Sequence, residues 1–142
     1  MSEGSSAVAK GLLADTSAWA AFFRGGGGPL VDTLKAALVE GRLYTAGPVR
    51  QELLAGAKHP KDLREIEALL ALCRAAAVGA EDFEAAGRMS YRLRRKGVTT
   101  HAVDALIAAV ALRHDLALLT ADADFEPLAR HEGLLLAGPT AG

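Results

Sequence analysis

Short apolar runs alternate with amphipathic stretches along the chain. Five runs have the length and composition of buried strands, at residues 11–14, 43–45, 75–78, 116–119 and 134–137. Between them, apolar residues recur every three or four positions, which predicts helices over residues 18–23, 29–40, 61–73, 81–96, 101–114 and 125–130, and one around Glu52. Strands that alternate with helices form parallel sheets covered on both faces. The pattern predicts an α/β fold, a three-layer sandwich with a five-stranded, mostly parallel sheet.

The length and composition fit one globular domain. A chain of 142 residues suggests a single domain, which we place at residues 11–142 after a small, polar extension (1–10) that we expect to be disordered. The single Cys73 excludes an internal disulfide framework and a Cys-rich zinc site, and it fits a reducing cytoplasm. There is no signal-peptide pattern, and no apolar run reaches the roughly 20 residues of a membrane span. We expect a cytoplasmic protein with no membrane partner.

The charge is balanced overall but locally uneven. Sixteen basic and seventeen acidic residues give a net charge of −1, which argues against nucleic-acid binding through bulk positive charge. The helix predicted at 81–96 nevertheless carries a basic edge, formed by Arg88, Arg92, Arg94, Arg95 and Lys96. This edge has two interpretations: a phosphate-binding surface, or a solvated helix end that complements the helix dipole.

Acidic residues follow the predicted strands. Asp15 ends the first strand, Glu52 lies in the helix after the second, and Asp122 and Asp124 directly follow the fourth. Asp104 lies in the first turn of the helix that leads into that fourth strand. Because open parallel sheets place their ligand sites at the carboxyl ends of the strands, we expect these carboxylates to converge at one edge.

Asp104 is the most informative of these acids. It is the only Asp, Glu, Lys or Arg between His101 and Leu112. The helix predicted there is apolar nearly all round, and Thr100 is suited to cap it. A lone buried carboxylate is costly unless it is paired or binds a metal, although bonding to backbone amides is an alternative. The other acids also have structural interpretations: Asp15 as a helix cap, Glu52 as helix surface, and the later pair as turn residues.

Taken together, the acids indicate a cation site. Two carboxylates about 4 Å apart repel each other by about 4 kcal/mol at an effective dielectric constant near 20, so four in one pocket require protons or cations. Oxygen ligands suit Mg²⁺ or Mn²⁺ rather than zinc. The four histidines show no metal-ligand pairing, and we interpret them as solvated or capping residues.

The order of these motifs resembles a known family. The sequence reads DTS at Asp15, QELLAG around Glu52, VDALIAAVAL around Asp104 and TADADF at residues 120–125. This combination is similar to the PIN domain, and more narrowly to the VapC-type toxins of toxin–antitoxin pairs. The resemblance covers the chain from Gly11 onward, and it implies a five-stranded parallel sheet and a metal-dependent endoribonuclease.

The resemblance also implies roles for individual residues. The catalytic, metal-binding quartet maps onto Asp15, Glu52, Asp104 and Asp122, with Asp124 as a further acid of the metal site. Three polar positions match residues that support the quartet: Thr16, Ser17 and Thr120. The implied reaction is hydrolysis of an RNA phosphodiester with Mg²⁺ or Mn²⁺, and the basic edge at residues 88–96 is a candidate contact for the RNA backbone.

Partners follow from the same resemblance. Members of the family form homodimers and are silenced by a cognate VapB-type antitoxin, whose C-terminal segment lies over the active site. Three apolar residues, Trp19, Phe22 and Phe23, are candidates to line that groove or to pack in the core.

Other functions remain open at this stage. One is an RNA-processing PIN nuclease outside any toxin–antitoxin pair, and another is a catalytically silent PIN-like binding module. A third is a phosphoacceptor or phosphatase domain, but receiver domains need a Lys after a late strand, and none follows the fourth or fifth strand here. Phosphatases of the dehalogenase type need Asp-x-Asp at the first strand, where this chain has Asp15-Thr16-Ser17.

Overall fold

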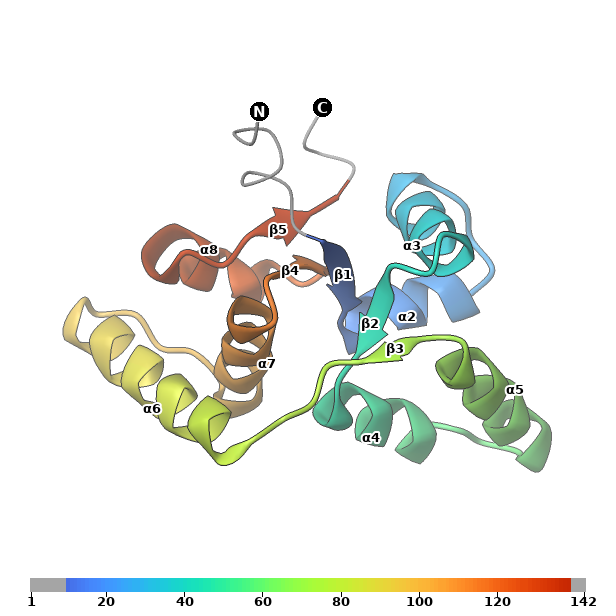
Figure 1. The fold of residues 1–142 in the computed structure, drawn as a ribbon, viewed down its shortest axis with the longest axis horizontal. Helices are drawn as coiled ribbons and strands as arrows, with labels where there is room; N and C mark the ends of the chain where they lie inside the picture. Colours follow the sequence, from blue (N-terminus) through green and yellow to red (C-terminus); the bar gives the residue numbers. More distant parts are fainter. Residues whose placement is uncertain (1–9, 139–142) are drawn as a thin grey trace.

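The sheet is five-stranded and parallel throughout. A computed structural model describes residues 10–138, so the extension expected at residues 1–10 lies almost entirely outside the described residues. The strands have the spatial order β3-β2-β1-β4-β5, and every neighbouring pair is parallel (Figure 1). Their bounds are β1 (Gly11–Ala14), β2 (Leu43–Thr45), β3 (Arg74–Ala75), β4 (Leu116–Leu119) and β5 (Leu136–Ala137). The predicted α/β architecture is confirmed.

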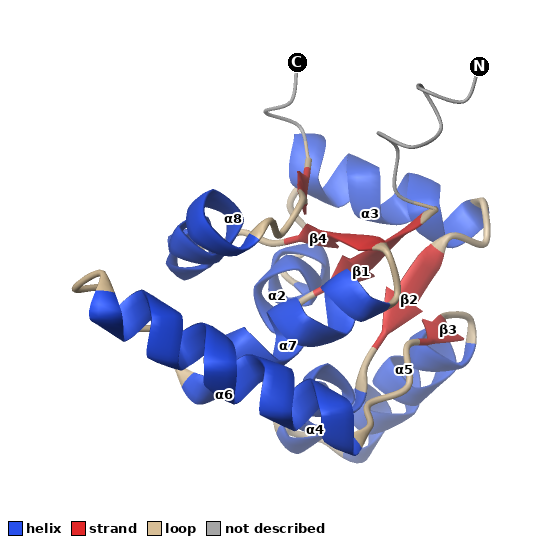
Figure 2. Ribbon diagram, turned by 60° about the vertical axis from the view of Figure 1, so that its left-hand side comes forward, coloured by secondary structure: helices blue, strands red, loops and turns tan. Residues whose placement is uncertain are grey.

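Helices cover both faces of this sheet. Their bounds are α2 (Thr16–Phe23), α3 (Pro29–Val39), α4 (Gly47–Ala55), α5 (Pro60–Ala71), α6 (Ala80–Arg95), α7 (Ala102–Arg113) and α8 (Glu126–Glu132). Helix α7 packs against β4 and carries α6 on its outer side, while α3 lies behind the sheet, against β1 and β2 (Figure 2). Within residues 10–138, no helix is both long and apolar enough to cross a membrane.

The two central strands explain why the carboxyl edge of the sheet is firmly placed. All four residues of β1 and all four of β4 are buried, and the strands pair in register from Gly11–Leu116 to Ala14–Leu119. Apolar runs buried on both faces are typical of a parallel sheet between helical layers. The residues that follow these strands, Asp15 and Thr120, are therefore held side by side at the same edge.

Helix α7 is buried along most of its length, as its apolar sequence predicts. Every residue from Ala105 to Ala111 is buried, and four of these seven are alanines, which let the helix approach the sheet closely. Its far end is clamped to α6, because Arg113 Nε and Nη2 donate to the two oxygens of buried Asp82 at 2.7 and 2.8 Å. These hydrogen bonds lower the pKa of Asp82. The clamp fixes how far the first turn of α7 extends toward the sheet edge.

The expected elements differ from the structure mainly at the sheet edges. Strand β3 begins one residue earlier than expected and has only two residues, and β5 begins two residues later, because each edge strand has a neighbour on one side only. The last helix is preceded by a 3₁₀ turn over Ala123–Phe125. The prediction that Thr100 caps α7 is wrong: His101 is the N-cap residue, and its side chain makes no capping bond.

Candidate active site

One pocket at the carboxyl edge of the sheet gathers the predicted acids. Its volume is about 480 Å³, and its walls come from the segments that follow β1 and β4, from α4, and from the first turns of α7. The predicted quartet lies in its lining: Asp15, Glu52, Asp104 and Asp122. No lysine or arginine of residues 10–138 contributes to this lining.

Asp15 is the most tightly held of the four. It is 4% exposed, and it caps α2 by accepting a hydrogen bond from the Ala18 N–H to Oδ1 at 3.0 Å. The Ser17 hydroxyl donates to the same oxygen at 2.7 Å, and the Thr120 hydroxyl donates to Oδ2 at 2.6 Å. The capping role that the sequence suggested is therefore real, and it orients the carboxylate in the pocket.

Thr120 links the segments that follow the two central strands by hydrogen bonds. Its hydroxyl donates to Asp15 and accepts from the Asp122 N–H at 2.9 Å, so one oxygen positions acids that follow β1 and β4. Ser17 adds a second link, because its hydroxyl oxygen also accepts from the Ala121 N–H at 2.9 Å. Two of the three predicted supporting residues, Ser17 and Thr120, thus belong to one hydrogen-bonded group at the strand ends.

Glu52 reaches the pocket from α4. Its residue is exposed, as expected for a helix surface, but its side chain is turned toward the β1–α2 corner. The Thr16 hydroxyl donates to Glu52 Oε1 at 2.5 Å. Thr16, the third supporting residue, therefore orients Glu52, which lies 36 positions away in the chain.

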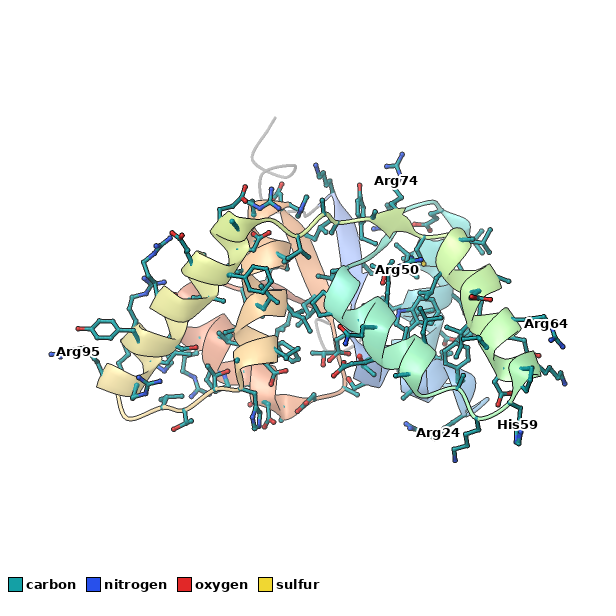
Figure 3. The ribbon with its side chains drawn as sticks, turned by 90° about the horizontal axis from the view of Figure 1, so that it is seen from below. Arg24, Arg50, His59, Arg64, Arg74 and Arg95 are labelled. Atoms are coloured by element: carbon teal, nitrogen blue, oxygen red, sulfur yellow. The ribbon has the colours of Figure 1, made fainter. Side chains whose placement is uncertain are left out.

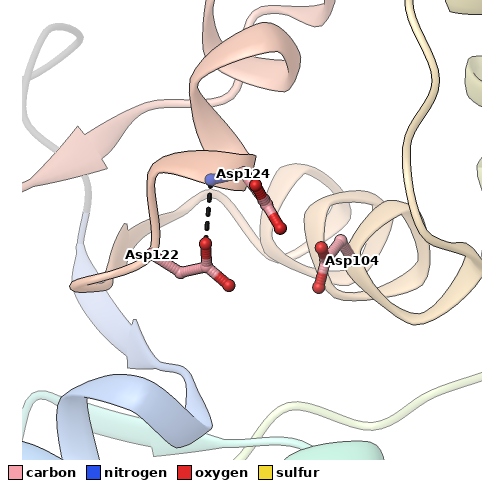
Figure 4. A group of neighbouring side chains, drawn as sticks. All are labelled: Asp104, Asp122 and Asp124. Atoms are coloured by element: carbon pink, nitrogen blue, oxygen red, sulfur yellow. Dashed lines mark hydrogen bonds between the residues drawn. The ribbon is translucent and has the colours of Figure 1, made fainter.

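The remaining acids form an open cluster. Asp104, Asp122 and Asp124 turn their carboxyl groups toward one another, and one oxygen of each lies within 4.8 Å of the others (Figure 4). Asp122 Oδ1 accepts from the Asp124 N–H at 2.9 Å, which holds this pair in a tight turn. Burial and, to a smaller extent, the charge of Asp122 together raise the pKa of Asp104 to about 6.

This donor set fits a hard divalent cation. All of its ligand atoms are carboxylate oxygens, the donors that Mg²⁺ and Mn²⁺ accept. The raised pKa of Asp104 reflects burial first and the neighbouring charge of Asp122 second, and a bound cation would favour the charged form against both. Asp15 and Glu52 border the same pocket and complete an acidic wall opposite the cluster.

His101 lines the pocket, and the sequence interpretation missed it. Its Nε2 lies 3.8 Å from Asp124 Oδ2, and its side chain is 79% exposed at the rim. The available signal was its position three residues before Asp104, one helical turn away at the start of α7.

The predicted basic edge lies on α6, outside the pocket lining. Arg88 Nη1 lies 3.9 Å from Glu84 Oε1, and Arg92 is held by Glu132 of α8. The other three cations are exposed at the end of the helix: Arg94, Arg95 and Lys96. Figure 3 shows Arg95 at one extremity of the molecule, with Arg24, His59 and Arg64 at the other.

A second groove adjoins the acidic pocket. It has a volume of about 530 Å³ between α2, α4 and α5, and it shares Thr16, Ala20 and Glu52 with the pocket. Phe23 lines this groove, whereas Trp19 is fully buried, and we place Trp19 in the core. The reason is helical geometry, because α2 turns Trp19 inward and leaves Phe23 at its outer end.

Comparison with known proteins agrees with the motif order and the fold. The PIN domain family model matches residues 12–131. The chain is 35% identical over 123 residues to VapC ribonuclease Mb1587 of Mycobacterium bovis, covering 84% of this chain and 92% of that protein. Ribonuclease VapC11 of Mycobacterium tuberculosis matches with the same identity and coverage.

Solved structures show the same fold at lower identity. A chain of the DNA-bound VapBC complex from Salmonella typhimurium superposes with a TM-score of 0.74 at 18% identity, covering 89% of this chain and 96% of that chain. A corresponding chain of VapBC2 from Rickettsia felis, also bound to DNA, gives a TM-score of 0.72 at 15% identity over the same shares. The chain described here therefore belongs to the PIN-domain family and, within it, to the VapC-type proteins.

Proposed function

We propose that this chain is a divalent-metal-dependent endoribonuclease that acts as the toxin of a toxin–antitoxin pair. The observation that carries the proposal is the acidic pocket, in which Asp15, Glu52, Asp104 and Asp122 lie together and to which no lysine or arginine of the described chain contributes. The 35% identity to two proteins named as VapC ribonucleases supports RNA as the substrate. The alternative of a silent binding module would not require this set of acids.

Asp104, Asp122 and Asp124 are the residues best placed to hold the cation, and Asp15 and Glu52 bound the site on its other side. A bound Mg²⁺ or Mn²⁺ supplies positive charge that offsets the carboxylates and the charge developing on a phosphate. The protein's own contribution is orientation. Three hydrogen bonds fix the Asp15 carboxylate, and the Thr16 hydroxyl fixes Glu52.

The open side of the pocket determines how RNA approaches. The catalytic acids repel a phosphodiester in the absence of a cation, so binding of metal and of substrate are coupled. His101 stands at the rim beside Asp124, where its imidazole can hydrogen-bond a phosphate oxygen or a base edge. The basic residues of α6 lie farther out and are candidates to hold the RNA backbone (Figure 3).

The adjoining groove is the proposed seat of the antitoxin. Its apolar floor includes Phe23, Leu53 and Ile66. Charged residues of both signs surround this floor: the acids Glu52, Asp62 and Glu65, and the basic residues Arg24 and Lys58. An extended or helical VapB-type segment with apolar and basic side chains fits this chemistry, and its end would reach the catalytic pocket through the shared residues. A homodimer is the assembly that we propose for the free chain.

The direct test is cleavage of single-stranded RNA by the purified chain with Mg²⁺ or Mn²⁺, and with a chelator. We expect cleavage with the metal and none with the chelator, and loss of cleavage in D104N with the fold retained. Cleavage by D104N at the wild-type rate would contradict the proposal. Addition of the antitoxin encoded beside the gene should stop cleavage by the wild-type chain.

A further inference from the structure

We propose that the last turn of α6 is a second contact surface for single-stranded RNA, separate from the catalytic pocket. We call this surface the α6 tip, and it consists of Tyr91, Arg94, Arg95 and Lys96. The inference rests on the proposed function, because it takes RNA to be the substrate. It goes beyond that function by assigning the tip an aromatic base-stacking residue and a role that depends on substrate length.

The cations of the α6 tip are available to a ligand. Arg94, Arg95 and Lys96 are exposed, and none of them forms an ion pair with another residue of the stretch 10–138. The two other arginines of the same helix differ, since Arg88 approaches Glu84 and Arg92 is bound to Glu132. The unpaired positive charge of α6 is therefore concentrated in one turn.

An aromatic ring accompanies these cations. Tyr91 is 57% exposed, and the guanidinium carbon of Arg95 lies 5.9 Å from the centre of its ring. The two residues are four positions apart, so they share the outward face of the helix. Exposed aromatic rings beside arginine are the means by which proteins stack unpaired bases and hold the adjoining phosphates.

The α6 tip is braced against the rest of the molecule. Arg92 Nε and Nη2 donate to the Glu132 carboxylate at 3.1 and 2.6 Å, and the Glu132 side chain is only 6% exposed. Leu93, between the tip residues, is fully buried in the core. Gly97, at φ +79°, then ends the helix. A surface held in this way loses little conformational entropy when it binds a flexible strand.

The α6 tip and the catalytic pocket are within reach of one RNA strand. Five residues lead from Lys96 to His101, which lines the pocket, so the two are separated by at most about 18 Å of extended chain. Figure 3 shows that Arg95 points away from the body of the molecule at this end. An RNA with its scissile phosphate in the pocket would therefore meet the α6 tip a few nucleotides away.

Charge complementarity favours RNA as the occupant. The catalytic pocket is acidic, and no lysine or arginine of residues 10–138 lines it, so permanent positive charge that attracts RNA has to come from elsewhere on the surface. The exposed ring of Tyr91 favours a strand with unpaired bases over a duplex. The α6 tip thus supplies both attractions that the pocket lacks.

The test compares RNA substrates of two lengths. One is a long unstructured RNA, and the other is a tetranucleotide that fills only the pocket; KM and kcat are measured for each, with metal present. We expect R94A/R95A to raise KM for the long RNA at least about fivefold more than KM for the tetranucleotide, and to reduce the slope of log KM against log salt by about 1.4, or about 0.7 for each lost phosphate contact. Y91A should raise KM for the long RNA about fivefold or more, whereas Y91F, which keeps the ring, should restore it.

The matched control is R64A/R74A, which removes two exposed arginines away from the α6 tip (Figure 3). We expect this variant to cut both RNAs with wild-type KM. An R94A/R95A enzyme with unchanged KM and salt slope for the long RNA would overturn the proposal, as would an equal loss for both lengths. In either case wild-type cleavage would still uphold the proposed function, whereas a wild-type chain that cuts neither RNA would contradict both.

Discussion

The two sides of the catalytic pocket hold their carboxylates in opposite ways. On the β1 side, Asp15 is buried and accepts three hydrogen bonds from Ala18, Ser17 and Thr120. On the α7 side, no residue of the stretch 10–138 donates a side-chain hydrogen bond to Asp104, and burial beside Asp122 raises its pKa to about 6. Hydrogen bonds within the folded chain hold the Asp15 carboxylate in place. The negative charge around Asp104 has no comparable compensation. The comparison teaches that hydrogen bonds set the geometry of one side of this site, whereas the other side keeps the uncompensated charge that the proposed cation would offset.

The largest expected effect is on RNA cleavage, where both sides are essential. We expect D15N and D104N each to reduce kcat/KM for RNA by about a thousandfold or more, because each removes a negative ligand or its support from the site. The measurement is cleavage of a labelled RNA at saturating Mg²⁺, with circular dichroism to show that each variant is folded. If only one variant lost activity, the pocket would not work as one unit.

Thr120 links the two sides, and its removal should have the next largest effect. T120A deletes the donor to Asp15 and the acceptor for the Asp122 N–H, and we expect a loss of about 1–2 kcal/mol in the free energy of unfolding. Activity should fall about tenfold, since both acids remain but are less well held. T120S keeps the hydroxyl and serves as the control. Wild-type activity in T120A would show that the bridge is dispensable.

In the absence of metal, substitutions on the two sides of the pocket should change the free energy of unfolding in opposite directions. We expect D15N to lower the free energy of unfolding by about 1 kcal/mol, because an amide replaces a charged acceptor of three hydrogen bonds. D104N should raise it by about 1 kcal/mol or less, after discounting for solvent screening, because it removes crowded charge. Urea denaturation at pH 7 with a chelator measures both. Destabilisation by D104N would contradict the view that the charged Asp104 carboxylate destabilises the folded chain when no cation is bound.

The smallest expected effect is the contribution of Asp104 to the pH dependence of the free energy of unfolding. The pKa of Asp104 is about 6 in the folded protein against an ordinary 3.8, so the folded state binds more protons between these values. The Asp104 contribution is therefore most favourable below about pH 4, declines as pH rises to about 6, and is constant above. Subtracting the D104N curve from the wild-type curve isolates it from groups such as Asp82, whose lowered pKa acts in the opposite direction. A flat difference curve would contradict the raised pKa.

Much of the fold was predictable because its signals are local. The strands β1 and β4 are uninterrupted apolar runs, and α7 is apolar on every face, so burial follows from sequence alone. The edge strand β3 was placed incorrectly, since its two residues are defined by hydrogen bonds to β2 rather than by hydrophobicity. The cap of α7 was also misassigned, because the side chain of Thr100 turns inward, where its Oγ1 is buried without a hydrogen-bond partner in the described part of the chain.

In the candidate site, too, some features were predictable from the sequence and others were not. The layout of strands and helices predicted that these acids converge, the motif resemblance identified the quartet, and the structure places all four acids in one pocket. The roles of Thr16 and Thr120 as hydrogen-bond donors depend on partners 36 and 105 residues away, which the motif resemblance suggested but local patterning does not. The sequence interpretation of His101 as solvated or capping agrees with its exposed N-cap position, but its approach to Asp124 depends on how α7 meets the 3₁₀ turn, which local sequence does not encode.

The most direct test of the account is to locate Mn²⁺ by anomalous diffraction in crystals of the wild-type chain. We predict an anomalous peak between Asp104, Asp122 and Asp124, at about 2.0–2.3 Å from at least two carboxylate oxygens, and no such peak in D104N crystals. A wild-type crystal soaked in Mn²⁺ that shows no peak in the pocket, from an enzyme that still cuts RNA in the same solution, would contradict the central claim.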